Sequence, residues 1–173
     1  MSFLELMRTR RSIRAFEGKA IEDEKIVALK EVVLRAPSGR SKEPWQFAFV
    51  QDSRIVKKLA LCKAHGSELL EGAPLAVVVC AEESKTDVWI EDASIAAISL
   101  QYAAHDMGLG SCWVQVRMRE AADGTESEAF VKKTLGLVSP DLRVLCVIAV
   151  GYPGETKKPR SESTLDYDKI GDM

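Results

Sequence analysis

Residues 88–113 read VWIEDASIAAISLQYAAHDMGLGSCW, and they decide the fold more than any other stretch of the chain. The part before Gly108 predicts a long helix whose apolar residues cover much of its circumference. One face carries Ile90, Ala93, Ala97, Leu100 and Ala104, and another carries Ile95, Ile98 and Tyr102. Such a helix is buried on more than one side, and its small residues let a second helix approach closely. In a chain of 173 residues we expect an identical subunit to cover the second face, the alternative being a central core helix of a monomer.

The glycines that follow this helix mark its end. Gly108 is placed to cap the helix, and Gly110 would let another flat group approach the backbone. The spacing does not fit a dinucleotide-binding fingerprint, because the segment follows a helix and its third glycine position is Trp113. It does not fit a serine-hydrolase elbow either, because the G-x-S-x-G frame is absent. Ordinary helix capping remains the alternative explanation for Gly108.

The flanking sequence predicts the rest of one domain. We expect helices at about 22–36, 53–64 and 127–135, a helical turn at 68–71 and a strand at 45–50. Residues 75–81 and 142–151 are near-continuous apolar runs, typical of strands buried on both faces, so they should form the centre of the sheet. No repeat or linker is visible. We therefore expect a single domain over residues 1–173, with an extended arm from about 152 to 173.

The bulk composition limits the functional classes. Lys and Arg number 24 against 26 Asp and Glu, so the net charge of −2 creates no field that would favour nucleic acid or an anionic membrane. The N-terminus lacks the apolar core of a secretory signal, and no stretch reaches the roughly 20 apolar residues of a membrane span. We expect a cytoplasmic protein. The four cysteines lack C-x-x-C spacing, so no metal site is expected, and Cys80 and Cys146 lie in apolar runs as core residues.

A short helix should precede the first candidate site. Ser2 and Glu5 have the spacing of a capping box, so the helix should begin near Phe3 and bury Leu4 and Met7.

Next comes the segment Arg10-Arg11-Ser12-Ile13-Arg14, which places three guanidinium groups and a hydroxyl within five residues. Arginine forks match phosphate or carboxylate oxygens, so the segment is a candidate anion site, the alternative being a solvated basic turn. The loop from Ala36 to Trp45 combines exposed backbone with hydroxyl groups that could hold ribityl or phosphate oxygens.

Together these segments resemble the nitroreductase family of FMN-dependent oxidoreductases, in order and over nearly the whole chain. The family's early arginine and serine segment is matched by Arg10, Arg11, Ser12 and Arg14, and its proline and serine loop by Pro37, Ser38, Gly39, Ser41, Glu43, Pro44 and Trp45. Its helix-ending segment is matched by residues 108–113, and its late Gly-Tyr-Pro segment by residues 151–153 with Arg160 as the basic residue that follows. The family's usual loop Asn and Gln are here Ser41 and Glu43, and Glu43 is expected to be a surface residue that pairs with Lys42 or Arg40.

The resemblance implies an α+β fold, with a central mixed or antiparallel sheet flanked by helices, in an intertwined homodimer that holds FMN at the subunit interface. It implies that Arg10, Ser12 and Arg160 hold the FMN phosphate and that Arg14 lies near the flavin N1 and O2 edge. Arg11 would contribute through its backbone or stem. Pro37, Ser38, Gly39 and Ser41 would reach the flavin from the neighbouring subunit, and the backbone of Ser111, Cys112 and Trp113 would meet it near N5.

The implied activity is a ping-pong cycle in which NADH or NADPH delivers a hydride to the flavin, and a nitroaromatic, a quinone or a related small planar acceptor then takes it. No side chain is required as a catalytic base, because the flavin carries the chemistry. Two alternatives stay open. One is a flavin-binding storage or sensing protein with little turnover, for which Ser41 and Glu43 are the sequence support. The other is a helix-rich interaction protein whose arginines bind an acidic partner.

Overall fold

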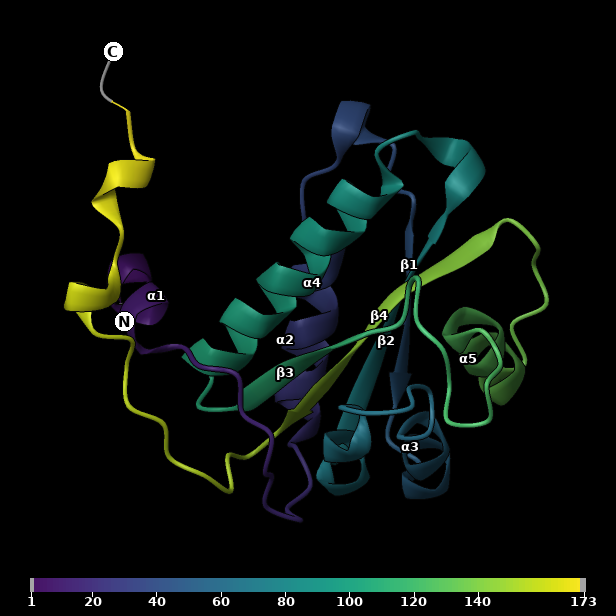
Figure 1. The fold of residues 1–173 in the computed structure, drawn as a ribbon, viewed down its shortest axis with the longest axis horizontal. Helices are drawn as coiled ribbons and strands as arrows, with labels where there is room; N and C mark the ends of the chain where they lie inside the picture. Colours follow the sequence, from purple (N-terminus) through teal and green to yellow (C-terminus); the bar gives the residue numbers. More distant parts are fainter. Residues whose placement is uncertain (1, 172–173) are drawn as a thin grey trace.

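The computed structural model describes residues 2–171, and within them it forms one antiparallel sheet with helices on both faces (Figure 1). The α-helices are α1 (Phe3–Thr9), α2 (Asp23–Leu34), α3 (Ser53–Leu59), α4 (Trp89–Asp106) and α5 (Ser127–Leu135). The strands are β1 (Trp45–Val50), β2 (Leu75–Glu82), β3 (Gly110–Gln115) and β4 (Leu142–Gly151). No helix in residues 2–171 is both long and apolar enough to span a membrane.

The sheet has the strand order β1-β2-β4-β3, and every neighbouring pair is antiparallel. The prediction that residues 75–81 and 142–151 form its centre is confirmed, because β2 and β4 are the two inner strands. Along β2, Val77 and Val79 face one core cluster, whereas Val78 and Cys80 face the other. An antiparallel strand with both faces covered therefore loses the usual alternation of apolar and polar residues.

The helices cover the sheet in two layers (Figure 1). Helices α2 and α4 pack on one face, and α3 and α5 pack on the other. Helix α3 is shorter than expected, because it ends at Leu59 rather than near Ala64. At this end the Ser67 hydroxyl donates to the Ala60 carbonyl at 2.6 Å, which gives a partner to a carbonyl that the helix no longer pairs.

Helix α1 begins where predicted, but the side of the helix that is buried differs from the prediction. The Ser2 Oγ accepts a hydrogen bond from the Glu5 N–H at 3.2 Å, which confirms the capping interaction. The expectation that Leu4 and Met7 are buried is wrong, because their side chains are 59% and 47% exposed and Leu6 is the buried residue. Helix α1 stands away from the sheet and contacts α4, so only one narrow side of it is covered.

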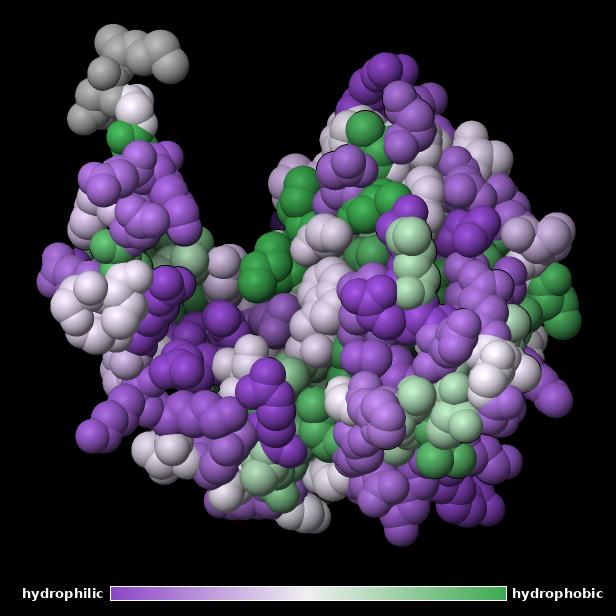
Figure 2. Space-filling view, in the orientation of Figure 1, coloured by the Kyte–Doolittle hydropathy of each residue, from purple (hydrophilic) through white to green (hydrophobic). Residues whose placement is uncertain are grey.

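Helix α4 is buried on one face and open on the other. Ala93, Ala97 and Leu100 pack fully against the sheet side of the core. Ile95, by contrast, is 38% exposed, and Ile98 is half-buried. Figure 2 shows apolar side chains along α4 facing the gap between the body and the part of the molecule that carries α1. Within residues 2–171, α1 covers only part of this second face, where the Phe3 and Tyr102 ring centroids lie 5.6 Å apart.

The residues after β4 form an extended segment, here called the arm (Tyr152–Gly171). It contains two short 3₁₀ turns, η4 (Glu162–Thr164) and η5 (Tyr167–Lys169), and it projects away from the body (Figure 1). Leu165, Tyr167 and Ile170 are all exposed along it. Residues 172 and 173 of the expected arm lie outside the described residues.

Candidate functional site

The turn after α4 is built by the first glycine of the segment 108–113. Gly108 has φ of +76°, a left-handed conformation that suits glycine. The Gly108 N–H donates to the His105 carbonyl at 3.0 Å, and the Leu109 N–H donates to the Ala104 carbonyl at 2.8 Å. This pair of bonds is a Schellman motif, so the prediction of a glycine cap is confirmed. The chain then enters β3 directly, an edge strand whose bounds were not predicted.

The second glycine admits a segment of the protein rather than a flat ligand. A Cβ atom on Gly110 would lie 2.8 Å from the Cβ of Ile13, so only glycine fits there. The Ile13 N–H donates to the Ser111 carbonyl at 3.0 Å, and Ser12 forms a parallel bridge with Ser111. The arginine segment 10–14 is therefore docked on the first residues of β3. Two of the sequence-predicted groups meet at this point.

The arm holds the arginine segment from the other side. The Lys157 Nζ donates to the Ser12 carbonyl at 3.0 Å, and a Glu155 carboxylate oxygen accepts from the Arg14 N–H at 2.6 Å. The Arg11 guanidinium donates to the Lys158 carbonyl. Lys157 and Glu155 were not among the predicted site residues, because charges on an exposed arm are typical of solvation. The one sequence feature that could have identified them as site residues is their position just after the Gly-Tyr-Pro segment.

The electrostatics around Cys112 report a cluster of positive charge. Burial raises the pKa of the Cys112 thiol, while Arg14, Lys157 and Arg10 act in the opposite direction. The cysteine therefore stays a neutral thiol near pH 7. The pKa of Glu155 is lowered because its carboxylate accepts the Arg14 N–H and pairs with Lys157. Arg14, Lys157 and Arg10 thus act together on the potential around Cys112, where their positive charge favours an anion.

Helix α4 contributes a neutral histidine to the same end of the site. Burial and the nearby Arg10 lower the pKa of His105, and its Nε2 lies 2.9 Å from the Thr9 hydroxyl. A hollow of about 240 Å³ is lined by Arg11, Ile13, His105, Gly110 and Lys157, among others. Arg11 and Lys157 supply basic groups that suit a phosphate, and the Glu155 carboxylate lines the hollow beside them. Arg10, Ser12 and Arg14 are not among its lining residues. Its volume is below the roughly 300–1,000 Å³ of ordinary ligand pockets, so a further wall is needed to enclose a larger ligand.

The loop from Ala36 to Trp45, called here the 36–45 loop, lies at the other end of α4. Its Gly39 N–H donates to the Asp92 carboxylate at 2.8 Å, in the first turn of that helix. Pro37 and Ser41 are exposed, and Ser38 and Gly39 are half-buried. At 1.5 Å per residue the 18 residues of α4 span about 27 Å. Within one chain, therefore, this loop does not meet the arginine segment (Figure 1).

The remaining candidates have local partners. The Arg160 guanidinium donates to the Thr164 hydroxyl and carbonyl, both at 3.1 Å within the arm, rather than to the arginine segment. The Trp113 side chain is half-buried, and its Nε1 donates to Gln115 at 2.9 Å. Glu43 is exposed, and residues 2–171 give it no ion pair with Lys42 or Arg40, so the expected pairing is wrong.

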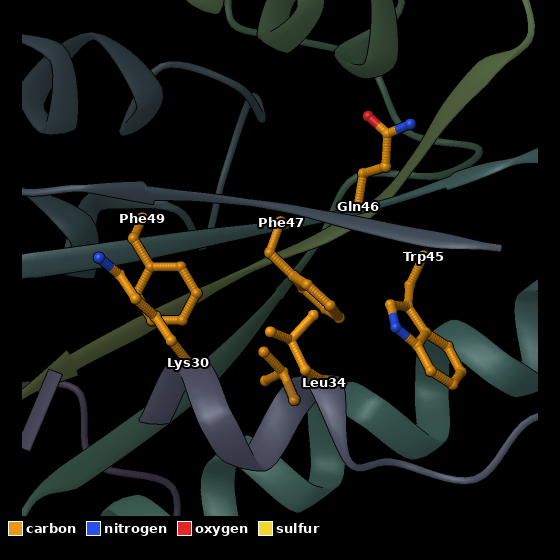
Figure 3. A pocket seen from close by; sticks show the side chains of 7 residues that line it. Lys30, Leu34, Trp45, Gln46, Phe47 and Phe49 are labelled. Carbon is orange, nitrogen blue, oxygen red and sulfur yellow. The ribbon is translucent and has the colours of Figure 1, made fainter. Parts of the chain in front are cut away.

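An open groove of about 620 Å³ runs between α2 and β1. Figure 3 shows Trp45, Phe47 and Phe49 pointing from the strand toward Lys30 and Leu34 of the helix. The groove contains none of the residues predicted to bind the cofactor. Trp45 is 7% exposed and packs with Ala36 and Ala96 at the base of the 36–45 loop, so its role here is structural.

Comparison with known proteins gives the same relationship in sequence and in structure. The profile of the nitroreductase family matches residues 7–64 and 61–152. An Archaeoglobus fulgidus protein, provisionally named an NADH dehydrogenase/NAD(P)H nitroreductase, is 33% identical over 158 residues, which cover 89% of this chain and 87% of that protein. The structure of an FMN-dependent nitroreductase from Clostridium difficile R20291 matches with a TM-score of 0.94 and 40% identity, over 98% of both chains. The docked arginine segment, the glycine-ended helix and these matches agree, and the chain belongs to the nitroreductase family.

Proposed function

We propose that the protein is an FMN-dependent oxidoreductase that takes a hydride from NADH or NADPH and passes it to a nitroaromatic, a quinone or a related planar electrophile. The observation that carries this proposal is the docking of Arg10–Arg14 on the first residues of β3, with Lys157 closing the segment from the arm. The names of the relatives support both the cofactor and the nicotinamide donor.

The residues at this end of α4 have distinct roles in binding. Arg10 and Ser12 would hold the phosphate of FMN, which carries close to two negative charges and is matched by charge-assisted hydrogen bonds. Arg14 would lie near the N1 and O2 edge of the ring, where its positive charge stabilises the reduced form. The family resemblance assigns Arg160 to the phosphate and gives Arg11 a contribution through its backbone or stem, and both side chains bond to the arm in this chain.

The flavin, when bound, supplies a ring that can accept and release a hydride. The protein's part is to bind the ring, orient it and leave one face open. Backbone donors of Ser111, Cys112 and Trp113 would face the N5 side of the ring. Burial raises the pKa of the Cys112 thiol, which makes it a poor proton donor as well as no base, so solvent would supply the proton. One opening then serves donor and acceptor in turn, which gives ping-pong kinetics.

The binding site is completed by a second subunit. The two halves of the site, Arg10–Arg14 and the 36–45 loop, lie at opposite ends of α4, a helix about 27 Å long. If two copies of α4 pack antiparallel about a twofold axis, the loop of each copy reaches the arginine segment of the other. The half-exposed face of α4 around Ile95 is available for this contact, and the arm is free to extend along the partner in an intertwined dimer. The nicotinamide donor is a metabolite of the cell interior, which supports a cytoplasmic location.

The proposal is tested by the visible spectrum of the purified protein under anaerobic conditions. Flavin bands that bleach on addition of NADH or NADPH would establish the oxidoreductase and identify its donor. Bound flavin that stays oxidised with both donors would favour the storage or sensing role. A colourless protein that does not bind added FMN would contradict the proposal and favour binding of an acidic partner. Sedimentation adds a second check, because a monomer with full flavin occupancy would contradict the shared site.

A further inference from the structure

Asp92 lies in the first turn of α4, and its carboxylate reaches out of the helix to the 36–45 loop. The residue is 3% exposed. Its Oδ1 accepts the Gly39 N–H at 2.8 Å. Its Oδ2 is buried and has no hydrogen-bond partner among the described residues. A half-satisfied buried carboxylate is unfavourable for folding, so the bond to the loop is the compensating contact that the structure shows.

The loop that Asp92 holds has a strained backbone. Arg40, Ser41 and Glu43 have φ of 52°, 52° and 45°, a left-handed conformation that disfavours residues other than glycine. Such strain persists only where the surroundings enforce it. The Ser38 Oγ helps from within the loop by accepting the Glu43 N–H at 3.0 Å. Among the described residues, Asp92 makes the one hydrogen bond that reaches the backbone of residues 38–43 from outside the loop.

The loop also sits tightly against the start of α4. A Cβ atom on Gly39 would lie 3.0 Å from the Val88 Cγ2 and 3.7 Å from the Asp92 Oδ1. The glycine therefore allows the backbone to approach closely enough for the hydrogen bond. A methyl group added at Gly39 would have to push the loop and Val88 apart by a few tenths of an ångström, which would lengthen the bond to Asp92.

We propose that Asp92 is a positioning residue, which acts through Gly39 to hold the 36–45 loop in the shape that contacts FMN bound by the neighbouring subunit. The inference rests on the proposed function and deepens it, because it names the residue that prepares one subunit for the cofactor of the other. The loop and the arginine segment of one chain lie at opposite ends of α4, so the effect of Asp92 crosses the dimer interface.

The first test is an FMN titration of the apoprotein, followed by flavin fluorescence. Asp92→Ala should raise the Kd for FMN about tenfold or more, because it removes a hydrogen bond to a charged group. Asp92→Asn should stay within about threefold of the wild type, because its amide oxygen accepts the same bond. Glu91→Ala is the matched control: it removes an exposed carboxylate from the same turn and should leave the Kd unchanged. Wild-type affinity in Asp92→Ala, or equal losses in the Ala and Asn variants, would overturn the inference.

A second pair of variants tests the position of the loop without touching Asp92. Gly39→Ala should weaken FMN binding because the added methyl meets Val88. Adding Val88→Ala in the same chain removes the opposing methyl and should restore the affinity. This pair keeps the inference falsifiable even where Asp92→Ala does not fold, since failure of Gly39→Ala to change the Kd would contradict it. Thermal unfolding of each apoprotein separates loss of the fold from loss of the loop.

Mixed dimers test the action across the interface. In a dimer of one Arg10→Ala subunit and one Asp92→Ala subunit, isolated with two different tags, both defects fall in one site and the other site is intact. Such dimers should bind one FMN tightly. Binding of none would show that Asp92 acts within its own subunit, and would overturn the inference while the proposed function stands. A wild-type protein that binds no FMN would instead defeat the proposed function and the inference with it.

Discussion

Adding a single methyl group at Gly110 should separate the arginine segment from the sheet. The new Cβ would lie 2.8 Å from the Cβ of Ile13 and 2.9 Å from both Cγ atoms, so three atoms of a buried side chain have to move. Because one clash is with the Cβ atom, a rotamer change of Ile13 cannot relieve it. The backbone of residues 12–14 must shift, and the bond from the Ile13 N–H to the Ser111 carbonyl, now 3.0 Å, lengthens or breaks.

The magnitude follows from three effects on Gly110→Ala. Overpacking costs about 1–3 kcal/mol, the lost hydrogen bond about 1 kcal/mol, and the reduced freedom of the unfolded chain offsets about 0.4–1 kcal/mol. The apoprotein should therefore lose about 2 kcal/mol in urea unfolding. FMN affinity should fall about tenfold or more, because Arg10 and Ser12 move with the segment and one weakened charge-assisted bond is worth about 1.5–3 kcal/mol.

Gly136→Ala is the matched control, with the same added methyl at the end of α5, away from the candidate site. No atom lies within 4 Å of its new Cβ, and the cost is the left-handed φ of +68°. That conformation costs about 1–2 kcal/mol, and the lower conformational entropy of the unfolded chain offsets part of the cost. The expected net loss is about 1 kcal/mol in the free energy of unfolding. FMN affinity should stay within about twofold of the wild type, because the docked segment is not touched. If both variants lose flavin affinity equally, or if Gly110→Ala keeps it, the reasoning about the docked segment is wrong.

Three further predictions concern single groups. Arg10→Ala should weaken FMN binding by about 1.5–3 kcal/mol in equilibrium dialysis, and an unchanged affinity would remove its phosphate role. The hydrogen bond from the Tyr152 hydroxyl lowers the pKa of Glu22 to about 2 from 4.5, so this contribution to stability is complete above pH 4.5 and is lost as the pH falls toward 2. The difference in unfolding free energy between wild type and Tyr152→Phe should therefore shrink below pH 4.5, whereas a constant difference from pH 7 to 3 would contradict the assignment. Burial raises the pKa of Cys62 to about 11 and of Cys80 to about 12, and all four cysteines are buried, so a thiol reagent should label the protein only on unfolding, which rapid labelling of the native state would refute.

The sequence was sufficient to predict those helices and strands whose side chains all lie in the same kind of surroundings, such as a strand that is buried on both faces. The runs at 75–81 and 142–151 pointed to the inner strands, because such side chains are favourable only when both faces of a sheet are covered. The end of the helix at 127–135 was predicted because glycine readily takes the left-handed conformation that terminates a helix, and Gly136 has φ of 68°. In α1, however, the pattern did not say which side would be buried, since a helix that touches one neighbour can turn any apolar residue toward it.

The candidate site was predictable as separate segments but not as an assembly. The arginines, the 36–45 loop and the glycine turn each carry local signals, whereas their spacing in three dimensions depends on the length and path of α4. The contacts of Lys157 and Asp92 could not be predicted from the sequence. Lys157 lies among solvated charges, and Asp92 is one of two adjacent acidic residues in the first turn of a helix, where acidic residues are common. Contacts between distant segments leave little trace in a single sequence.

The length of α4 also sets the spacing between the 36–45 loop and the glycine turn, and each of the two proposed sites depends on that spacing. Each residue adds 1.5 Å and turns the helix by about 100°, so one inserted residue between Asp92 and Gly108 would shift the loop anchor and the glycine turn in both distance and direction. In the proposed dimer that error would appear in both sites at once. An insertion of the same size between β3 and α5 would leave the length of α4, and with it the spacing within each site, unchanged. Two different members of the family are therefore expected to form working hybrid sites only when their α4 helices have equal lengths.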